Sequence, residues 1–257
     1  MDPKQHWTAF ATLVGKEIHR FTRIWLQTLL PPVITTVLYF IIFGNLIGRN
    51  IPPIHGYTYM EYIVPGLVMM SVINNAYTNV VFSFFSSKFQ RFIEEMLVSP
   101  MPSITILLGY LFGGVIRGLL VGAIVLGISL FFSPLRVEHP ILMLVIALLT
   151  SALFSLGGFI NAMFAKTFDD VSIVPTFILG PLTYLGGVFY SIHLLSPTWQ
   201  TISLFNPILY IVNAFRYSCL GVADIGIEWA LSILVGCTVI LFIVAYRLLE
   251  RGYGIRH

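Results

Sequence analysis

Few residues of this chain have the types and spacing that catalysis or metal binding requires. Asp169 and Asp170 are adjacent acids, of the kind that hold divalent cations in other proteins. They stand in the short loop sequence KTFDD, where an acid that caps the start of a helix is the simpler interpretation. His193 lies between Ser191 and Ser196, which suggests a membrane protease, but no GxSxG turn or orienting acid accompanies it. We therefore expect no catalytic residue and no metal site.

Nucleotide and cofactor motifs are also missing from the sequence. No G-x-x-x-x-G-K-[ST] occurs, so this chain does not cradle a nucleotide phosphate by itself. Cys219 and Cys237 belong to no CxxC or Cys/His cluster, which argues against a zinc or redox site. The net charge of +3 is too small and scattered to suggest a nucleic-acid partner. We expect no cofactor in this chain.

Composition defines the elements that must position any functional residue. The 257 residues are 57% hydrophobic and only 10% charged, whereas soluble domains carry about 25% charged residues. A soluble fold cannot hide that much apolar surface, so the excess must face lipid. The N-terminus lacks the features of a cleaved signal peptide, and the first long apolar run begins near Leu26. We expect an all-α polytopic membrane protein that forms a single domain, residues 1–257.

Six apolar runs are long enough for the roughly 20 residues that a spanning helix needs. They lie at 26–47, 60–83, 104–131, 141–164, 171–190 and 229–248. A further run at 202–222 carries Asn206, Pro207, Asn213 and Arg216, which are costly in lipid. We therefore expect the segment 191–228 to form a re-entrant helical hairpin on the outer side.

The distribution of Lys and Arg predicts the orientation. With six spans and an inside N-terminus, the outer side holds only Arg49, Arg136 and Arg216. The inner side then holds Lys4, Lys16, Arg20, Arg23, Lys88, Arg91, Lys166, Arg247, Arg251 and Arg256. Both termini are therefore expected in the cytoplasm. A seventh span would place the last three arginines outside.

Two amphipathic helices are expected on the inner side. In residues 1–25, apolar residues recur at steps of three and four (Trp7, Phe10, Val14, Ile18, Phe21 and Trp25), with Lys16, Arg20 and Arg23 on another face. In the loop 85–103, Phe85, Phe89, Phe92, Ile93, Met96 and Leu97 form one face, and Lys88, Arg91, Glu94 and Glu95 the other. Pro100 and Pro102 should end that loop helix.

The spans contain few ionisable groups. Arg117, in GGVIRGLL, is the clear mid-span candidate, and it can snorkel toward the cytoplasmic surface. Glu61 lies at a span boundary. Secondary transporters usually carry ionisable groups in their spans to bind or relay ions. The energy source is therefore expected in another subunit.

Two stretches resemble the permease subunits of ABC-2 type transporters. They are QRFIEEMLVSPMPSITILLGYLFGG and PLTYLGGVFYSIHLLSPTWQTISLFNPILYIVNAFRYSCLG, and VPGLVMM in the second span fits the same pattern. The resemblance covers nearly the whole chain in order and spacing, and it does not specify a substrate.

The resemblance implies a bacterial plasma-membrane (inner-membrane) exporter for a lipidic, glycan or hydrophobic compound. Such permeases pair as dimers and bind two separate ATPase subunits, which hold the ATP and Mg²⁺. The ATPase contact would then comprise Lys88, Phe89, Arg91, Phe92, Glu94, Glu95 and Met96. An extracytoplasmic cap over the translocation path would comprise Pro197, Trp199, Asn206, Pro207 and Arg216. The other partner is membrane lipid. The alternatives are an ion-coupled secondary transporter and a membrane enzyme or scaffold without a transport role.

Overall fold

The computed structural model describes residues 3–48, 51–99, 101–133 and 137–254. These residues form helices and loops, with one isolated bridge between Ile54 and Tyr57. The long elements are α1 (Pro3–Arg23), α4 (Tyr59–Phe89), α6 (Ser103–Phe132), α7 (Pro140–Phe164) and α12 (Ile227–Glu250). The shorter ones are α2 (Trp25–Thr28), α3 (Leu30–Tyr39), η1 (Phe40–Ile47), α5 (Phe92–Val98), α8 (Phe168–Val174), η3 (Pro175–Leu179), α9 (Gly180–Tyr184), η4 (Ile192–Leu194), α10 (Pro197–Leu204) and α11 (Pro207–Leu220). The all-α fold class is confirmed.

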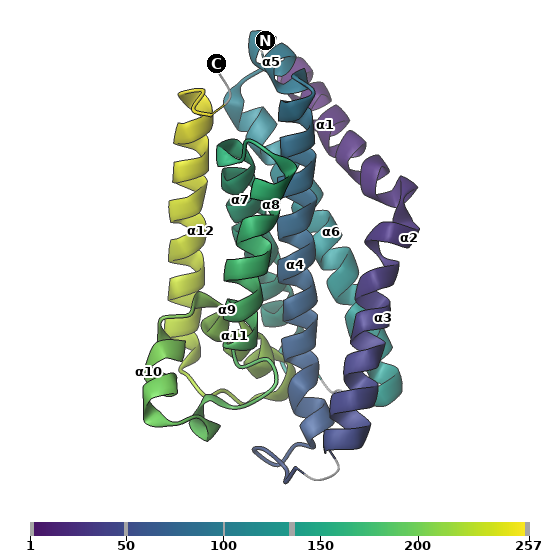
Figure 1. Ribbon diagram of the computed structural model, residues 1–257, viewed down its shortest axis with the longest axis vertical. Helices are drawn as coiled ribbons and strands as arrows, with labels where there is room; N and C mark the ends of the chain where they lie inside the picture. Colours follow the sequence, from purple (N-terminus) through teal and green to yellow (C-terminus); the bar gives the residue numbers. More distant parts are fainter. Residues whose placement is uncertain (1–2, 49–50, 100, 134–136, 255–257) are drawn as a thin grey trace.

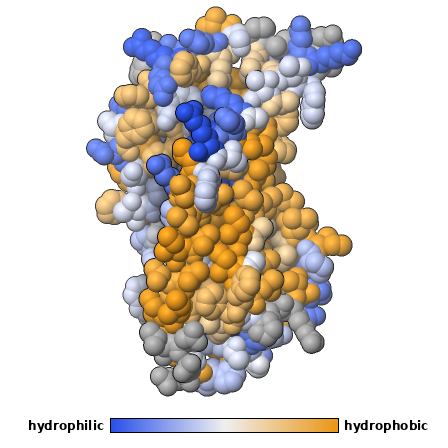
Figure 2. All heavy atoms as spheres, turned by 90° about the vertical axis from the view of Figure 1, so that its right-hand side faces the viewer, coloured by the Kyte–Doolittle hydropathy of each residue, from blue (hydrophilic) through white to orange (hydrophobic). Residues whose placement is uncertain are grey.

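Five segments of the described chain are long and apolar enough to cross a membrane. They are Trp25–Gly44, Tyr59–Phe89, Ser103–Phe132, Pro140–Phe164 and Ile227–Glu250, and each overlaps an expected span. Figure 2 shows a broad hydrophobic band across the middle of one face, with hydrophilic residues gathered toward its upper and lower ends. The fifth expected span, 171–190, is the one without a match, and it is divided into α8, η3 and α9 by Pro175 and Gly180. Its crossing stays a prediction.

Helix α4 lies at the centre of the bundle, between α6 and α7 (Figure 1). Close packing depends on glycines of α6. A Cβ at Gly114 would lie 2.2 Å from Ser155 Oγ of α7 and 2.5 Å from Val80 of α4. A Cβ at Gly118 would lie 3.0 Å from the Ala76 Cβ of α4. Small residues at such spacing let membrane helices approach closely, which holds α4 in place.

The N-terminal helix α1 packs against a second glycine stripe of α6. A Cβ at Gly109 would lie 2.3 Å from Leu13, and one at Gly113 would lie 2.7 Å from the Glu17 Cβ. Leu13, Glu17 and Phe21 are buried, whereas Trp7 is 69% exposed. The prediction that Arg20 lies on a separate basic face is therefore wrong. Its side chain points inward and donates a hydrogen bond to Asn79 of α4. Its partner Glu17 lies on the packed face.

The helices begin and end in two groups. Helix α1 begins, α12 ends and α5 lies at one end of the molecule, while α10 lies at the opposite end (Figure 1). Helix α4 begins at the α10 end with a capping box, in which Glu61 bonds the Thr58 backbone N–H and Thr58 accepts from Glu61. The presence of an acid at this span boundary is thus explained by the role of Glu61 in capping the start of α4. Of the basic residues used for orientation, Arg49, Arg136 and Arg256 lie outside the described residues.

Helix α11 stays at the α10 end of the bundle. At its start, Asn206 donates to the Leu182 carbonyl of α9 at 2.6 Å. At its other end, Leu220 accepts from Tyr57 at 2.7 Å, and Ser218 accepts from the His139 N–H at 2.9 Å. Tyr57 and His139 lie just before the first residues of α4 and α7, so both ends of α11 contact the same end of the bundle. Its 14 residues reach about 21 Å, which is short of the roughly 30 Å of a bilayer core.

Candidate functional site

The expected loop helix at 85–103 is divided in two. Helix α4 continues to Phe89, and a new helix, α5, begins after Arg91, whose φ of 61° is left-handed. The prediction of one continuous amphipathic helix is therefore wrong, because the left-handed residue interrupts the helical backbone between the two pieces. Helix α5 ends at Val98 and α6 begins at Ser103, while Pro100 and the Leu97 side chain lie outside the described part.

Helix α5 leaves most of its side chains available to a partner. Ile93 is buried and anchors the helix, whereas Phe92 is 47% exposed. Glu94 and Glu95 are exposed and Met96 is half-buried. The surface therefore combines an apolar group with two acids at the end of the molecule where α1 begins. A hollow of about 440 Å³ lies between α5 and Lys16 of α1.

Lys88 and Phe89 have contacts within the chain. The Lys88 Nζ donates to the carbonyls of Met163 at 2.6 Å and Ala165 at 2.8 Å, at the C-terminal end of α7. A cation there satisfies the last carbonyls of the helix. Phe89 is 62% exposed and lies against Phe168. The Lys88 ammonium group is thus engaged within the chain, although it lines a hollow of about 510 Å³ together with Arg91 and Glu94.

At the opposite end, the residues expected in the cap divide into exposed and buried groups. Pro197 and Trp199 lie exposed on α10. Asn206 is buried and caps α11, because its Oδ1 accepts from the Ile208 N–H at 3.0 Å. Pro207 occupies the first turn of α11, where its missing N–H leaves no bond unmade.

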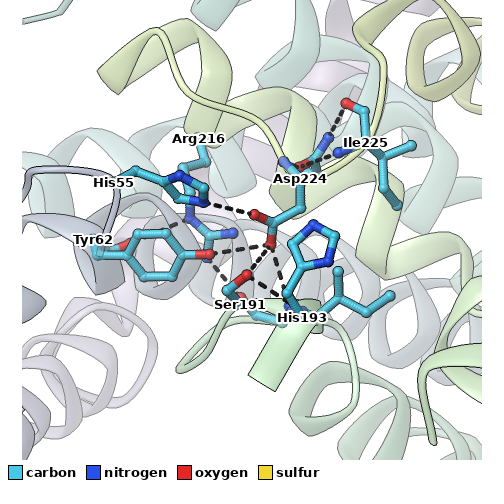
Figure 3. A network of polar contacts seen from close by, with 10 residues as sticks. His55, Tyr62, Ser191, His193, Arg216, Asp224 and Ile225 are labelled. Atoms are coloured by element: carbon cyan, nitrogen blue, oxygen red, sulfur yellow. Dashed lines mark hydrogen bonds and ion pairs between the residues drawn. The ribbon is translucent and has the colours of Figure 1, made fainter. Parts of the chain in front are cut away.

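Arg216 is buried at the centre of a polar cluster that joins α4 and α11 to the loops between helices (Figure 3). Its Nη2 donates to the Gly187 carbonyl at 2.6 Å, and its guanidinium lies 4.0 Å from the Tyr62 ring centroid. Asp224 accepts from Ser191 at 2.8 Å and lies within hydrogen-bond distance of His55, at 3.2 Å (Figure 3). The cost of a buried arginine is thereby offset by the protein itself.

The carboxylate of Asp224 is held ionised by its surroundings. Burial on its own raises the pKa of this carboxyl. The hydrogen bond from Ser191, the charge of Arg216 and the hydrogen bonds of the Ile192 N–H and His55 together outweigh it, so the pKa lies below its usual range. Asn213 fixes the same loop, because its Oδ1 accepts from the Asp224 N–H at 2.7 Å. The loop after α11 is thus tied to α4, α11 and the segment before η4.

A second polar cluster lies between α1, α4 and α6 and was not anticipated from the sequence. Glu17 is fully buried; it accepts from Ser83 at 2.6 Å and pairs with Arg20 at 3.0 Å. Arg117 donates to Asn75 at 3.1 Å. Arg117 therefore does not extend to the surface as expected. Its side chain is hydrogen-bonded between α6 and α4. Amides within an apolar span are the signal that would have found it.

The residues considered for catalysis have structural roles. Asp170 forms a capping box with Thr167, and the backbone N–H groups of Lys166 and Thr167 lower the pKa of the Asp170 carboxyl, which confirms the helix-cap interpretation. Asp224 bonds Ser191 directly, and His193 contacts Ser191 only through its backbone N–H in the described structure. That geometry does not orient a histidine as a general base.

Comparison with known proteins identifies the family. The chain is 55% identical over 251 residues to the inner membrane transport permease YadH of Escherichia coli K12, covering 98% of each chain. It is 24% identical over 231 residues to nodulation protein J of Rhizobium leguminosarum bv. viciae, covering 88% of each chain. The sequence model of the ABC-2 type transporters matches residues 8–220. The chain belongs to the ABC-2 type transporter family.

Proposed function

We propose that this chain is the transmembrane permease subunit of an ATP-driven ABC exporter. It forms the translocation path for a lipidic, glycan or hydrophobic compound, while a separate ATPase subunit hydrolyses ATP. The observation that carries the proposal is α5, a short helix fixed by Ile93 that presents Phe92, Glu94 and Glu95 outward. An apolar group beside acids suits a groove with a basic rim on a partner.

The contact with the ATPase is assigned to Phe89, Arg91, Phe92, Glu94, Glu95 and Met96. Lys88 supports this surface from behind, because its ammonium group holds the end of α7. Movement of the ATPase subunits would then be transmitted directly to α4 and α7, which flank the translocation path. A difference in contact free energy between the two ATPase arrangements is what shifts a permease between two states.

The proposed orientation places α5 and both termini in the cytoplasm. Basic residues of the described chain gather at the α5 end, which agrees with their preference for the cytoplasmic side. Six spans follow if α8, η3 and α9 together make the fifth crossing. The α10–α11 hairpin then caps the path from outside, with Pro197, Trp199, Asn206, Pro207 and Arg216. The name of YadH supports a location in the bacterial inner membrane.

The assembly we propose contains two copies of this chain and two ATPase subunits. ATP and Mg²⁺ are bound by the ATPase subunits, since this sequence has no phosphate-binding loop. The permease itself is not an enzyme. The transport name of YadH supports a role in moving a compound across the membrane.

A tagged chain captured from solubilised membranes tests the proposal. The expected result is a co-purified protein with a P-loop, and ATP hydrolysis by the captured complex. A matched variant reverses Glu94 and Glu95 to Lys, and it should recover less ATPase, because exposed ion pairs contribute about 0.2–1 kcal/mol each. Recovery of a well-folded permease that never carries an ATPase would overturn the proposal.

A further inference from the structure

A cavity of about 290 Å³ lies beside Arg117, between α2 and α3 on one side and α4 on the other. Arg117 is the charged residue among its described lining. Neutral hydrogen-bonding groups surround it, from Gln27, Thr35, Ser71 and Asn74. A volume near the lower end of the usual 300–1,000 Å³ for ligand sites suits a head group and not a whole amphiphile.

The guanidinium of Arg117 is incompletely satisfied by the described residues. Its donors reach Asn75 at 3.1 Å, but Asn79 and the Thr28 carbonyl only at 3.5 Å. Its Nε is buried and has no acceptor among the described residues. A neutral amide balances none of its charge. An anion in the cavity would supply the missing charge and a closer acceptor for the Nη donors.

The local charge count favours a negative ligand. The cluster contains two cations, Arg20 and Arg117, and one acid, Glu17, which is paired with Arg20. The described cluster therefore has a net charge of +1. Such a charge within the bilayer is costly and usually marks a functional position.

The depth of the cavity favours an amphiphile over a free anion. Arg117 is 14 residues beyond Ser103, the first residue of α6, hence about 21 Å along a helix that crosses the membrane. Pro31, Pro32 and Leu67 give the cavity an apolar side next to its polar one. A compound with an anionic head and an apolar tail can occupy both sides, and it can arrive through the lipid.

We propose that this cavity binds the anionic head group, a phosphate or carboxylate, of an amphiphile, and that such amphiphiles are the class of compound exported. The export part rests on the function proposed above, whereas the binding site is independent of it. Arg117 supplies the charge-assisted hydrogen bonds, and Ser71 and Asn74 supply neutral contacts. Asn75 and Asn79 hold the guanidinium in position.

Binding of dodecyl phosphate to the purified chain in a neutral detergent, followed by native mass spectrometry, tests the site. Arg117→Gln should weaken binding at least about tenfold, as expected for loss of a hydrogen bond to a charged group. Ser71→Leu should block the cavity while the charge stays, and Arg117→Lys should retain part of the binding. Arg247→Gln, which removes an exposed arginine of α12, should change nothing. If Arg117→Gln does not fold, Ser71→Leu and Arg117→Lys decide.

Two further probes identify what is recognised. Dodecylphosphocholine has the same phosphate and tail but no net charge, and inorganic phosphate has no tail; both should bind at least about tenfold more weakly. Equal binding of either, or unchanged binding in the Ser71→Leu variant, would overturn the site. Stimulation of ATP hydrolysis in the ATPase complex by dodecyl phosphate, lost in Arg117→Gln, supports export. Binding without stimulation would remove the export assignment and leave a resident-lipid site. Failure of the complex to form would instead refute the proposed function alone.

Discussion

Replacing Glu17 with Ala should weaken the attachment of the N-terminal helix to the bundle. Glu17 is fully buried in α1, where its two oxygens accept from Ser83 of α4 and from Arg20. Without the carboxylate, Arg20 and Arg117 are left with no acid in the described cluster. The remaining cations then repel each other across Asn79, whose Oδ1 both of them contact.

The size of the effect follows from the burial of the pair. Removing one partner of a buried ion pair costs about 3–5 kcal/mol, because the other charge is left uncompensated. The Arg20 side chain keeps 30% of its surface exposed, which lets water relieve part of this cost. We therefore expect the lower end of the range, about 3 kcal/mol, which is roughly a 100-fold change in the equilibrium for α1 opening.

Hydrogen exchange of the α1 backbone amides measures this equilibrium directly. In Glu17→Ala, these amides should exchange about 100-fold faster than in the parent protein. Lys16→Ala is the matched control, since Lys16 is exposed on the same helix. Glu17→Gln should have a smaller effect because its amide oxygen can still accept from Ser83. If Glu17→Ala exchanged no faster than Lys16→Ala, the ion pair would not be what holds α1.

Four further predictions follow from the two ends of the bundle and the α1–α6 contact. Cysteines placed singly at Trp199 and Ala223 should both react with an impermeant thiol reagent from outside; labelling from opposite sides would refute the hairpin. Phe92→Asp should abolish ATPase co-purification, because the proposed interface would bury the new charge without a partner, which is far costlier than losing a contact at its rim, while Phe92→Leu should retain it. If Phe92→Asp inserts normally and keeps full assembly, α5 is only a connector. Because the pKa of Asp224 is lowered in the folded protein, its stabilisation is complete above about pH 4 and is lost as the pH falls through the lower folded value. The melting temperature of the parent should therefore fall on acidification in a way that Asp224→Asn does not; parallel profiles would contradict this. Gly113→Leu should displace α1, seen as faster exchange of its amides, since even a Cβ there meets Glu17 at 2.7 Å; unchanged exchange would refute the packing.

The sequence predicts the spans well because their signal is local. About 20 apolar residues in a row specify a membrane helix without reference to any neighbour. All of the five candidate spans were expected, within a few residues, except that α4 runs on to Phe89. The fifth expected span shows the limit, because Pro175 and Gly180 divide it in a way that hydropathy averages conceal.

The candidate site is less accessible from the sequence, because tertiary contacts decide where its polar groups point. Arg20 fits the basic face of an amphipathic helix, yet it points inward because it bonds Asn79 and pairs with Glu17. Lys88 fits the polar face of a loop helix, yet its ammonium group donates hydrogen bonds to the carbonyls at the end of α7. Arg91 in a left-handed conformation divides that loop helix, and no pattern in the sequence indicates it.

ATP hydrolysis by the captured complex in lipid nanodiscs is the most direct test of the proposed function. The permease with its co-purified ATPase should hydrolyse ATP, and Phe92→Asp should remove both the ATPase and the hydrolysis while the permease still inserts. A purified permease that moves compounds across a vesicle membrane with no ATPase subunit and no ATP present would contradict the account.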